Sequence, residues 1–190
     1  MESKKTEMVE AAGRIILESD INALTMDALA FRMEIPHSEL SIYFEKDTDI
    51  LKLMLFSLDN EIQKLINTLV ASNQSPEEEL QNLFKDLYEL FNRKPYYLSL
   101  IFSNELTEMD SELYDILLRI RTAAEMYLLQ VITQGKNKKI FNTKTNSRSL
   151  VNRILVSFRL LMNEQMVSIN LVRNLKMLRS KNEKDFYKNN

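Results

Sequence analysis

The sequence predicts an all-α fold of eight or nine helices, and three observations support this prediction. Apolar residues recur along most of the chain at the i, i+3, i+4 and i+7 spacing of amphipathic helices. Capping residues or prolines stand just before several of these periodic segments. Only 2 glycines and 3 prolines occur in 190 residues, and a β-rich fold needs more turn residues than that.

Composition narrows the class of protein. Apolar residues make up 45% of the chain and charged residues 27%, as in ordinary globular proteins. The absence of cysteine excludes disulfides, thiol nucleophiles and thiolate metal sites. No apolar run approaches the roughly 18 residues of a membrane span, and Glu2, Glu7 and Glu10 stand where a signal peptide needs positive charge. We therefore expect a cytoplasmic protein with no membrane, metal or cofactor.

The N-terminal part predicts three helices. An apolar stripe at Met8–Ile16 indicates a first helix over about residues 4–19. Thr25 is a good N-cap for a second, short helix, which ends near Ile35 because a residue before proline avoids helical torsions. A third short helix is expected over about 36–44. Two such helices joined by a tight corner form a helix-turn-helix.

Short motifs follow one another here at fixed spacing: Ala11-Ala12, Leu24-Thr25-Met26, Leu29-Ala30, Glu34-Ile35-Pro36, Ser41-Ile42-Tyr43-Phe44 and Ile50-Leu51. At matching spacing, they resemble the N-terminal domain of the tetracycline-repressor (TetR) family of bacterial transcription regulators. That family usually has glycine at the position of Glu34, serine at that of Pro36 and lysine at that of Asp47. The resemblance implies a DNA-binding domain at residues 1–46 and an effector-binding, dimerising helical domain at 47–190.

Beyond the helix-turn-helix, further helices are expected over about residues 48–72, 76–92, 96–104, 111–134 and 147–166, with a last one from about 171. Ser75 followed by Pro76 marks one helix start, and Gly135 is expected to end another. The helix over 48–72 would be a rod of roughly 40 Å, either a plain scaffold or a lever between the two domains.

Charge is distributed unevenly. Residues 1–50 carry 5 Lys/Arg and 11 Asp/Glu, a net charge of −6, and residues 51–135 carry 7 and 13, again −6. Residues 136–190 carry 13 and 3, a net charge of +10. DNA affinity comes largely from neutralising phosphates, so an acidic helix-turn-helix argues for weak, salt-sensitive binding. The alternative is that the charges merely scatter over solvated surfaces.

The resemblance implies a DNA-facing surface around the third helix. Its candidate residues are Lys4, Lys5, Thr25, His37, Ser38, Glu39, Tyr43 and Lys46. Lys4 and Lys5 are phosphate contacts or merely solubilising, and Glu39 can accept a hydrogen bond from a cytosine amino group. His37 has neither a second histidine nor a cysteine with which to form a transition-metal site.

A second candidate site is an apolar ligand pocket among the helices of residues 49–134. Its candidate lining consists of Met54, Phe84, Tyr88, Phe91, Tyr97, Phe102, Tyr114, Met126 and Tyr127. Small-molecule pockets are mostly apolar with a few polar groups, but a packed core would use the same side chains. The resemblance, in which this domain usually binds a small inducer, implies a small-molecule effector whose identity the sequence does not give.

The last two helices carry apolar stripes that one domain does not fully cover, namely Ile154, Phe158, Leu161 and Met162, then Leu171, Leu175 and Leu178. In the family such helices pair about a two-fold axis, so the resemblance implies a homodimer. A dimer would place two recognition helices at a spacing that matches successive major grooves.

Motifs for catalysis are missing from the sequence, so we expect no enzyme. There is no Gly-rich phosphate loop, nucleophile elbow or metalloprotease signature. The acidic cluster at Glu105–Asp115 suits helix capping better than a metal site. The leading prediction is a TetR-like repressor that binds a double-stranded DNA operator and is released by a small ligand. The alternative is a TetR-fold dimer that has lost DNA binding and binds a ligand or protein partner.

Overall fold

The computed structural model describes residues 2–162 except 104 and 143, and over these residues it is entirely helical, as the sequence predicts. The chain divides into two compact units, Met1–Asn152 and Arg153–Asn190. The functional division predicted at residue 46/47 falls inside the first unit and stays a prediction. No helix in the described residues is long and apolar enough to span a membrane.

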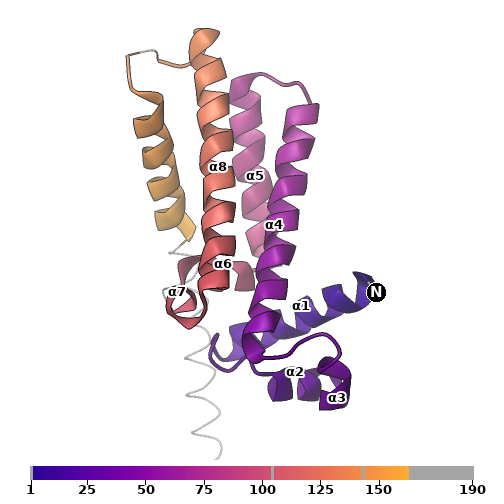
Figure 1. Cartoon of the computed structure of the whole chain (residues 1–190). Helices are drawn as coiled ribbons and strands as arrows, with labels where there is room; N and C mark the ends of the chain where they lie inside the picture. Colours follow the sequence, from indigo (N-terminus) through magenta and orange to yellow (C-terminus); the bar gives the residue numbers. More distant parts are fainter. Residues whose placement is uncertain (1, 104, 143, 163–190) are drawn as a thin grey trace, which may run out of the picture. The chain divides into compact units, whose positions relative to one another are not determined.

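Three helices form the N-terminal lobe: α1 (Glu2–Glu18), α2 (Met26–Met33) and α3 (His37–Leu40) (Figure 1). Their buried apolar residues include Met8, Ala12, Ile16, Leu29 and Leu40. The predicted cap of α2 is confirmed, since the Thr25 hydroxyl accepts a hydrogen bond of 3.1 Å from the Ala28 amide. An N-cap of this kind typically stabilises a helix by about 1 kcal/mol.

The corner between α2 and α3 keeps the glycine-type geometry without a glycine. Glu34 has a φ of 55°, in the left-handed region, where a residue with a Cβ costs about 1–2 kcal/mol. The amide of Ile35 donates to the Ala30 carbonyl at 3.1 Å, the bond that closes a helix through a left-handed residue. The corner therefore forms despite its departure from the TetR pattern.

The third helix is shorter than predicted. It was expected to reach about residue 44, but α3 ends at Leu40 and residues 41–43 form a turn. The Ser41 hydroxyl donates back to the His37 carbonyl at 3.1 Å, and the Tyr43 amide bonds to Leu40 at 2.8 Å. These local bonds replace the helical ones and leave Phe44 buried and Tyr43 half-buried.

Five helices build the rest of the first unit: α4 (Asp47–Ala71), α5 (Pro76–Arg93), α6 (Tyr96–Phe102), α7 (Leu106–Met109) and α8 (Ser111–Asn137). The long helices α4, α5 and α8 pack against one another, and α6 also contacts α1 (Figure 1). Ser75 caps α5 through a reciprocal bond with Glu78, as its position before Pro76 predicts. The single turn α7 was not predicted.

The prediction that Gly135 ends its helix is wrong. Helix α8 continues to Asn137, and Lys139, with a φ of 59°, takes the left-handed position beyond its end. Gly135 serves close packing instead, because a Cβ there would lie 2.2 Å from the Phe141 ring. The Ile140 amide also donates to the Gly135 carbonyl at 2.8 Å.

A further helix begins at residue 147 and continues to residue 162, the last one described. Of its predicted dimer-interface residues, Ile154 and Phe158 are half-buried, Leu161 is exposed and Met162 is buried. The expected continuation to residue 166 lies outside the described residues. So does the helix expected from residue 171, with Leu171, Leu175 and Leu178.

Candidate nucleic-acid interface

Helix α3 is the candidate recognition helix, and it lies next to α2 at the end of the N-terminal lobe (Figure 1). Leu40 is fully buried and fixes one side of α3, while His37 and Ser38 are exposed on the other. Ile42, in the turn that follows, is 77% exposed. This surface can meet a partner without any rearrangement of the lobe core.

Three of the predicted DNA-facing residues lie together. The Lys4 ammonium in α1 forms an ion pair with the Glu39 carboxylate of α3 and lies 5.8 Å from the centre of the Tyr43 ring. The hydrogen bond that Lys4 donates to Glu39 raises the pKa of Lys4 above its ordinary value. A cation beside the candidate recognition helix is therefore already compensated by a carboxylate of the same chain.

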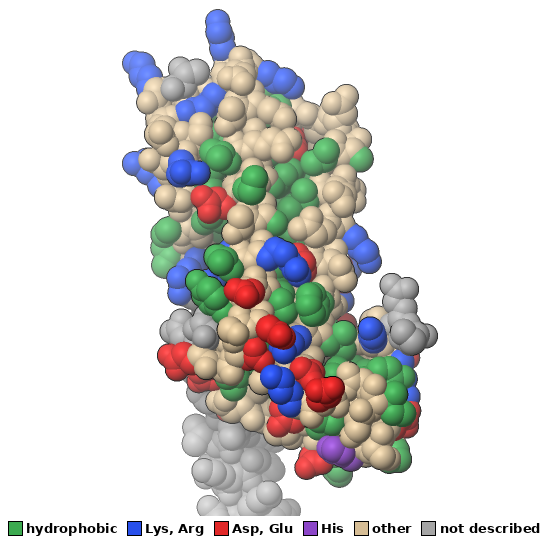
Figure 2. All heavy atoms as spheres, in the orientation of Figure 1, with side chains coloured by type: hydrophobic (Ala, Val, Ile, Leu, Met, Phe, Trp, Pro, Cys, Tyr) green, Lys and Arg blue, Asp and Glu red, His purple; other side chains and the backbone are tan. Residues whose placement is uncertain are grey.

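His37 and Thr25 line a surface hollow of about 540 Å³, together with Lys46 and the carboxylate-bearing Asp27 and Asp47. The His37 Nε2 atom is 3.6 Å from an Asp27 oxygen, so a protonated histidine would be paired. Thr25 is half-buried and its hydroxyl caps α2. Figure 2 shows the histidine at the end of the lobe, next to acidic side chains.

Lys46, the last predicted cation of the recognition region, is also paired. Its ammonium lies 3.0 Å from Asp110, at the start of α8, and Lys52 lies 3.3 Å from the same carboxylate. These bonds, with one from the Glu112 amide, lower the pKa of Asp110 to about 2. Asp110 caps α8, as predicted for the acidic cluster. The described residues contain no group of three or more His, Asp or Glu side chains placed to hold a metal ion.

The pattern Asp47-Thr48-Asp49 predicts caps and first-turn acids for α4, and sequence reasoning missed only that Asp47 also binds α2. Asp47 accepts a 2.7 Å hydrogen bond from the Met26 amide, the first amide of α2. Asp49 accepts from the amides of Glu45 and Lys46 at 2.9 and 3.1 Å. Asp47 therefore links the start of α4 to the start of α2, whereas Asp49 caps its own helix. Their position at a helix start was the available signal, since acids there commonly bind free amides.

The predicted pocket residues fall into three groups by exposure. Met54, Phe91, Tyr97 and Tyr127 are buried, whereas Phe84 and Phe102 are half-buried. The exposed ones are Tyr88 at 51%, Tyr114 at 44% and Met126 at 66%. Tyr88 was expected to point inward, which is wrong in the described chain, because Leu83, Leu90 and Phe91 form the buried face of α5. That these residues line an effector pocket stays a prediction.

Two buried tyrosines bring polar groups into this bundle. The Tyr97 hydroxyl donates to the Ser57 hydroxyl at 2.9 Å, and the Tyr127 hydroxyl donates to Glu79 at 2.7 Å. Burial raises the pKa of both tyrosines, and the neighbouring Glu79 carboxylate raises that of Tyr127 further. Both hydroxyls therefore stay protonated and act as hydrogen-bond groups at neutral pH.

Comparison with known proteins places this fold among transcription regulators. No protein-family model matches the chain and no curated protein does. Similar solved structures include a TetR/AcrR-family transcriptional regulator from Thermobifida fusca YX-ER1 (TM-score 0.68, 14% identity, 85% of each chain covered). The regulator MbdR from Azoarcus sp. CIB has a TM-score of 0.76 at 19% identity and covers 87% of this chain and 88% of its own.

A third similar structure is the transcriptional regulator FadR from Bacillus subtilis in complex with stearoyl-CoA. It has a TM-score of 0.67 at 16% identity, and the match covers 89% of this chain and 93% of that one. The chain thus shares its fold with these three solved regulators, the first of which is described as a member of the TetR/AcrR family. The similarity implied by the N-terminal motifs is confirmed at the level of the fold.

Proposed function

We propose that this protein is a DNA-binding transcription regulator of the TetR type, a repressor that a small molecule releases from its operator. The observation that carries the proposal is the exposed surface of α3 and the turn after it, with His37, Ser38 and Ile42, on a lobe in which Leu40 is buried. A short exposed helix held at the end of a small bundle is the arrangement that enters a major groove.

The charges of this surface support weak binding that depends steeply on salt. Phosphates would have to compete with Glu39 for Lys4 and with Asp110 for Lys46. Each exchange replaces one ion pair by another, so its net gain is small. Sequence discrimination would then depend on hydrogen bonds and apolar contacts from α3 and Tyr43 to base edges.

Dimerisation belongs to the same proposal. Val156, Leu160 and Leu161 are each more than half exposed in the single chain, and apolar residues in such a row often mark a protein contact. We expect a homodimer at micromolar concentration. Leu161→Glu should shift it to monomer in light scattering, because a buried unpaired charge is costly. A monomeric wild type would contradict the expectation.

The effector is proposed to be a small molecule bound within the bundle of α4, α5, α6 and α8. The similar FadR of Bacillus subtilis was crystallised with stearoyl-CoA. In this chain the Tyr97–Ser57 and Tyr127–Glu79 pairs supply polar groups inside an apolar bundle, the combination that small-molecule sites use.

The deciding experiment is a fluorescence anisotropy titration of the purified protein against DNA from upstream of its own coding region, at low and at moderate salt. The wild type is expected to bind at low salt and to lose affinity sharply as salt rises. Tyr43→Ala should abolish binding while keeping the thermal transition of the lobe. No binding at any salt concentration would leave the alternative, a dimer that does not use this motif for DNA.

A further inference from the structure

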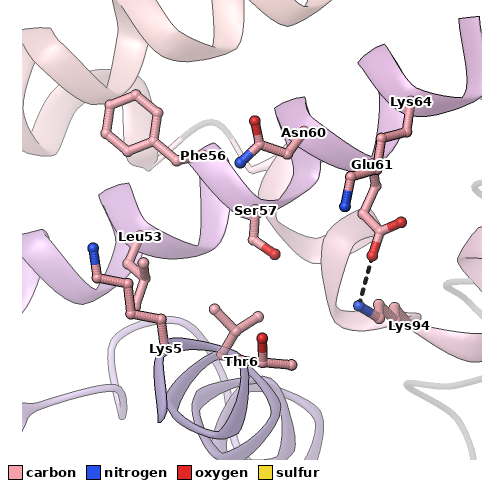
Figure 3. Close-up of a pocket in the computed structure, with 10 residues that line it drawn as sticks. Lys5, Thr6, Leu53, Phe56, Ser57, Asn60, Glu61, Lys64 and Lys94 are labelled. Atoms are coloured by element: carbon pink, nitrogen blue, oxygen red, sulfur yellow. Dashed lines mark hydrogen bonds and ion pairs between the residues drawn. The ribbon is translucent and has the colours of Figure 1, made fainter. Parts of the chain in front are cut away.

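A groove of about 770 Å³ lies between α1 and α4, and it includes Ser57, the hydrogen-bond partner of the buried Tyr97. Its walls come from the N-terminal lobe and from the middle of the rod that joins this lobe to the bundle (Figure 3). The lining residues are Lys5, Thr6, Val9, Leu53, Phe56, Ser57, Asn60, Glu61, Lys64 and Lys94. Its volume falls in the range of about 300–1,000 Å³ that small-molecule sites occupy.

Positive charge is in excess in this groove, although the surrounding sequence is acidic. Lys94 is already engaged, with Glu61 at 3.0 Å and Glu10 at 3.5 Å. The ammonium groups of Lys5 and Lys64 form no hydrogen bond or ion pair with any described residue. Two lysines of the groove lining are therefore not held in an ion pair, and an anion beside Lys64 would gain a favourable charge interaction.

The remaining lining is half apolar and half polar. Val9 is buried and Leu53 half-buried, and the Phe56 ring is 44% exposed. Figure 3 shows Lys64 near Glu61 and Lys94 at one end of the groove, and Lys5 and Leu53 at the other. An occupant that fits this order has an anionic head at the Lys64 end and an apolar body that reaches Leu53.

We propose that the groove between α1 and α4 binds a small amphipathic anion, with a carboxylate or phosphate head held by Lys64 and an apolar body against Leu53 and Val9. Asn60, exposed beside Lys64 on α4, can donate a further hydrogen bond to the head. The binding does not require DNA, and the groove adjoins the expected pocket through Ser57, which lines the groove and accepts the hydrogen bond of Tyr97.

Occupancy of this groove would also affect the recognition surface, and this second step rests on the proposed function. Lys5 lines the other end of the groove and is also a candidate phosphate contact, so the apolar body of a bound ligand would lie beside a side chain of the candidate DNA-facing surface. A ligand held by both α1 and α4 would further fix the angle between lobe and rod. A ligand shifts such an equilibrium only by its differential affinity for the two arrangements.

The test uses isothermal titration calorimetry of the full chain without DNA, with octyl phosphate as the probe. Octyl glucoside and inorganic phosphate are the matched probes that lack the charge and the apolar body, respectively. Octyl phosphate should bind, and both controls should bind at least about tenfold more weakly, since each forfeits one half of the site. Raised ionic strength should weaken octyl phosphate binding.

The diagnostic variant is Lys64→Glu, and the control is Lys85→Glu on α5. Lys85 is an exposed lysine outside the groove, so its substitution makes the same change in charge away from the site. Lys64→Glu should weaken octyl phosphate by about tenfold or more, whereas Lys85→Glu should leave it nearly unchanged. Lys64→Gln is the milder variant, in case Lys64→Glu does not fold, and it should show a smaller loss of octyl phosphate affinity. Equal losses in Lys64→Glu and Lys85→Glu, or equal binding of octyl glucoside, would overturn the proposal.

A further measurement with DNA distinguishes the groove proposal from the proposed DNA-binding function. In the anisotropy assay, octyl phosphate should release the wild type from upstream DNA but not release Lys64→Glu. If octyl phosphate binds in the calorimeter and no DNA binds at all, the groove proposal is supported and the proposed DNA-binding function is contradicted. If DNA binds and octyl phosphate gives no heat at several temperatures, the groove proposal fails and the DNA-binding function stands.

Discussion

Gly13 of α1 lies directly against the ring of Tyr96 of α6, so closely that a Cβ on Gly13 would stand 2.3 Å from Tyr96 Cδ1. The Tyr96 hydroxyl donates to Glu10, one turn earlier in α1, at 3.1 Å. Burial raises the pKa of Tyr96 well above its ordinary value. This contact joins α1 of the N-terminal lobe to α6.

Gly13→Ala should destabilise the protein by about 1–3 kcal/mol, because the added methyl group has no room beside a buried ring. Helix propensity alone would give the opposite sign, since alanine stabilises a helix interior by about 1 kcal/mol relative to glycine. Urea unfolding of the wild type and the variant measures the balance. In a Tyr96→Ala background the same change should become stabilising, and a destabilising result in both backgrounds would contradict steric overlap as the cause.

Asp47 should tolerate asparagine better than lysine, although lysine is the usual residue of the TetR pattern at this position. Asparagine keeps an oxygen that can accept the Met26 amide bond of 2.7 Å, whereas lysine leaves that amide without its partner. The expected loss for Asp47→Lys is about 0.5–2 kcal/mol, as for a lost helix cap. Thermal unfolding of both variants measures it, and equal stability of the two would show that the bond contributes little.

The helices themselves were predictable from the sequence because their signals are local. The Thr25 cap, the Ser75-Pro76 start and the apolar stripe of α4 all act within a few residues. The end of α8 was not predictable from the sequence. The glycine at position 135 is needed for its contact with the Phe141 ring, not for a left-handed torsion at a helix end. Periodicity gives a helix face but does not tell a glycine at a helix end from a glycine under a ring.

The candidate interface was predicted in its members but not in its pairing. Lys4, Glu39 and Tyr43 were named separately as DNA-facing residues, yet the structure joins them in one cluster. Lys4 and Glu39 are 35 positions apart, and no local pattern in a single sequence reports a contact at that separation. The groove between α1 and α4 was missed for the same reason, because its walls come from two distant segments.

The Asp110 carboxylate should make stability sensitive to acid. Its pKa is lowered from 3.8 to about 2 in the folded chain, chiefly by the hydrogen bond from Lys46. A lowered carboxyl pKa stabilises the folded state above pH 4 or so, and this contribution is lost as the pH falls through about 4 toward 2. Urea unfolding between about pH 6 and pH 3 should therefore show a smaller decline for Asp110→Asn than for the wild type.

Asp115→Asn is the matched control for the acid experiment. Asp115 is an exposed carboxylate on the same helix with no ion pair among the described residues, so its removal should leave the pH dependence almost unchanged. Asparagine at position 110 keeps the capping role at the start of α8, which confines the difference to the ion pairs. Parallel curves for Asp110→Asn and the wild type would show that those pairs contribute nothing at low pH.

Glu39→Gln should strengthen DNA binding and make it steeper in salt. The wild-type carboxylate holds the Lys4 ammonium in an ion pair, and the amide would release that cation to a phosphate while removing a negative charge from the recognition helix. One additional phosphate contact changes the slope of log K against log salt by about −0.9 for duplex DNA. Anisotropy titrations with upstream DNA at three salt concentrations give both the affinity and the slope.

Glu45→Gln supplies the control, because the Glu45 side chain is exposed and pairs with no described residue. It makes the same change in net charge within the same lobe but releases no lysine, so it should raise affinity less and leave the salt slope close to the wild-type value. In a Lys4→Ala background, Glu39→Gln should lose most of its advantage. Equal gains from Glu39→Gln and Glu45→Gln would mean that general repulsion, rather than the captured Lys4, limits binding.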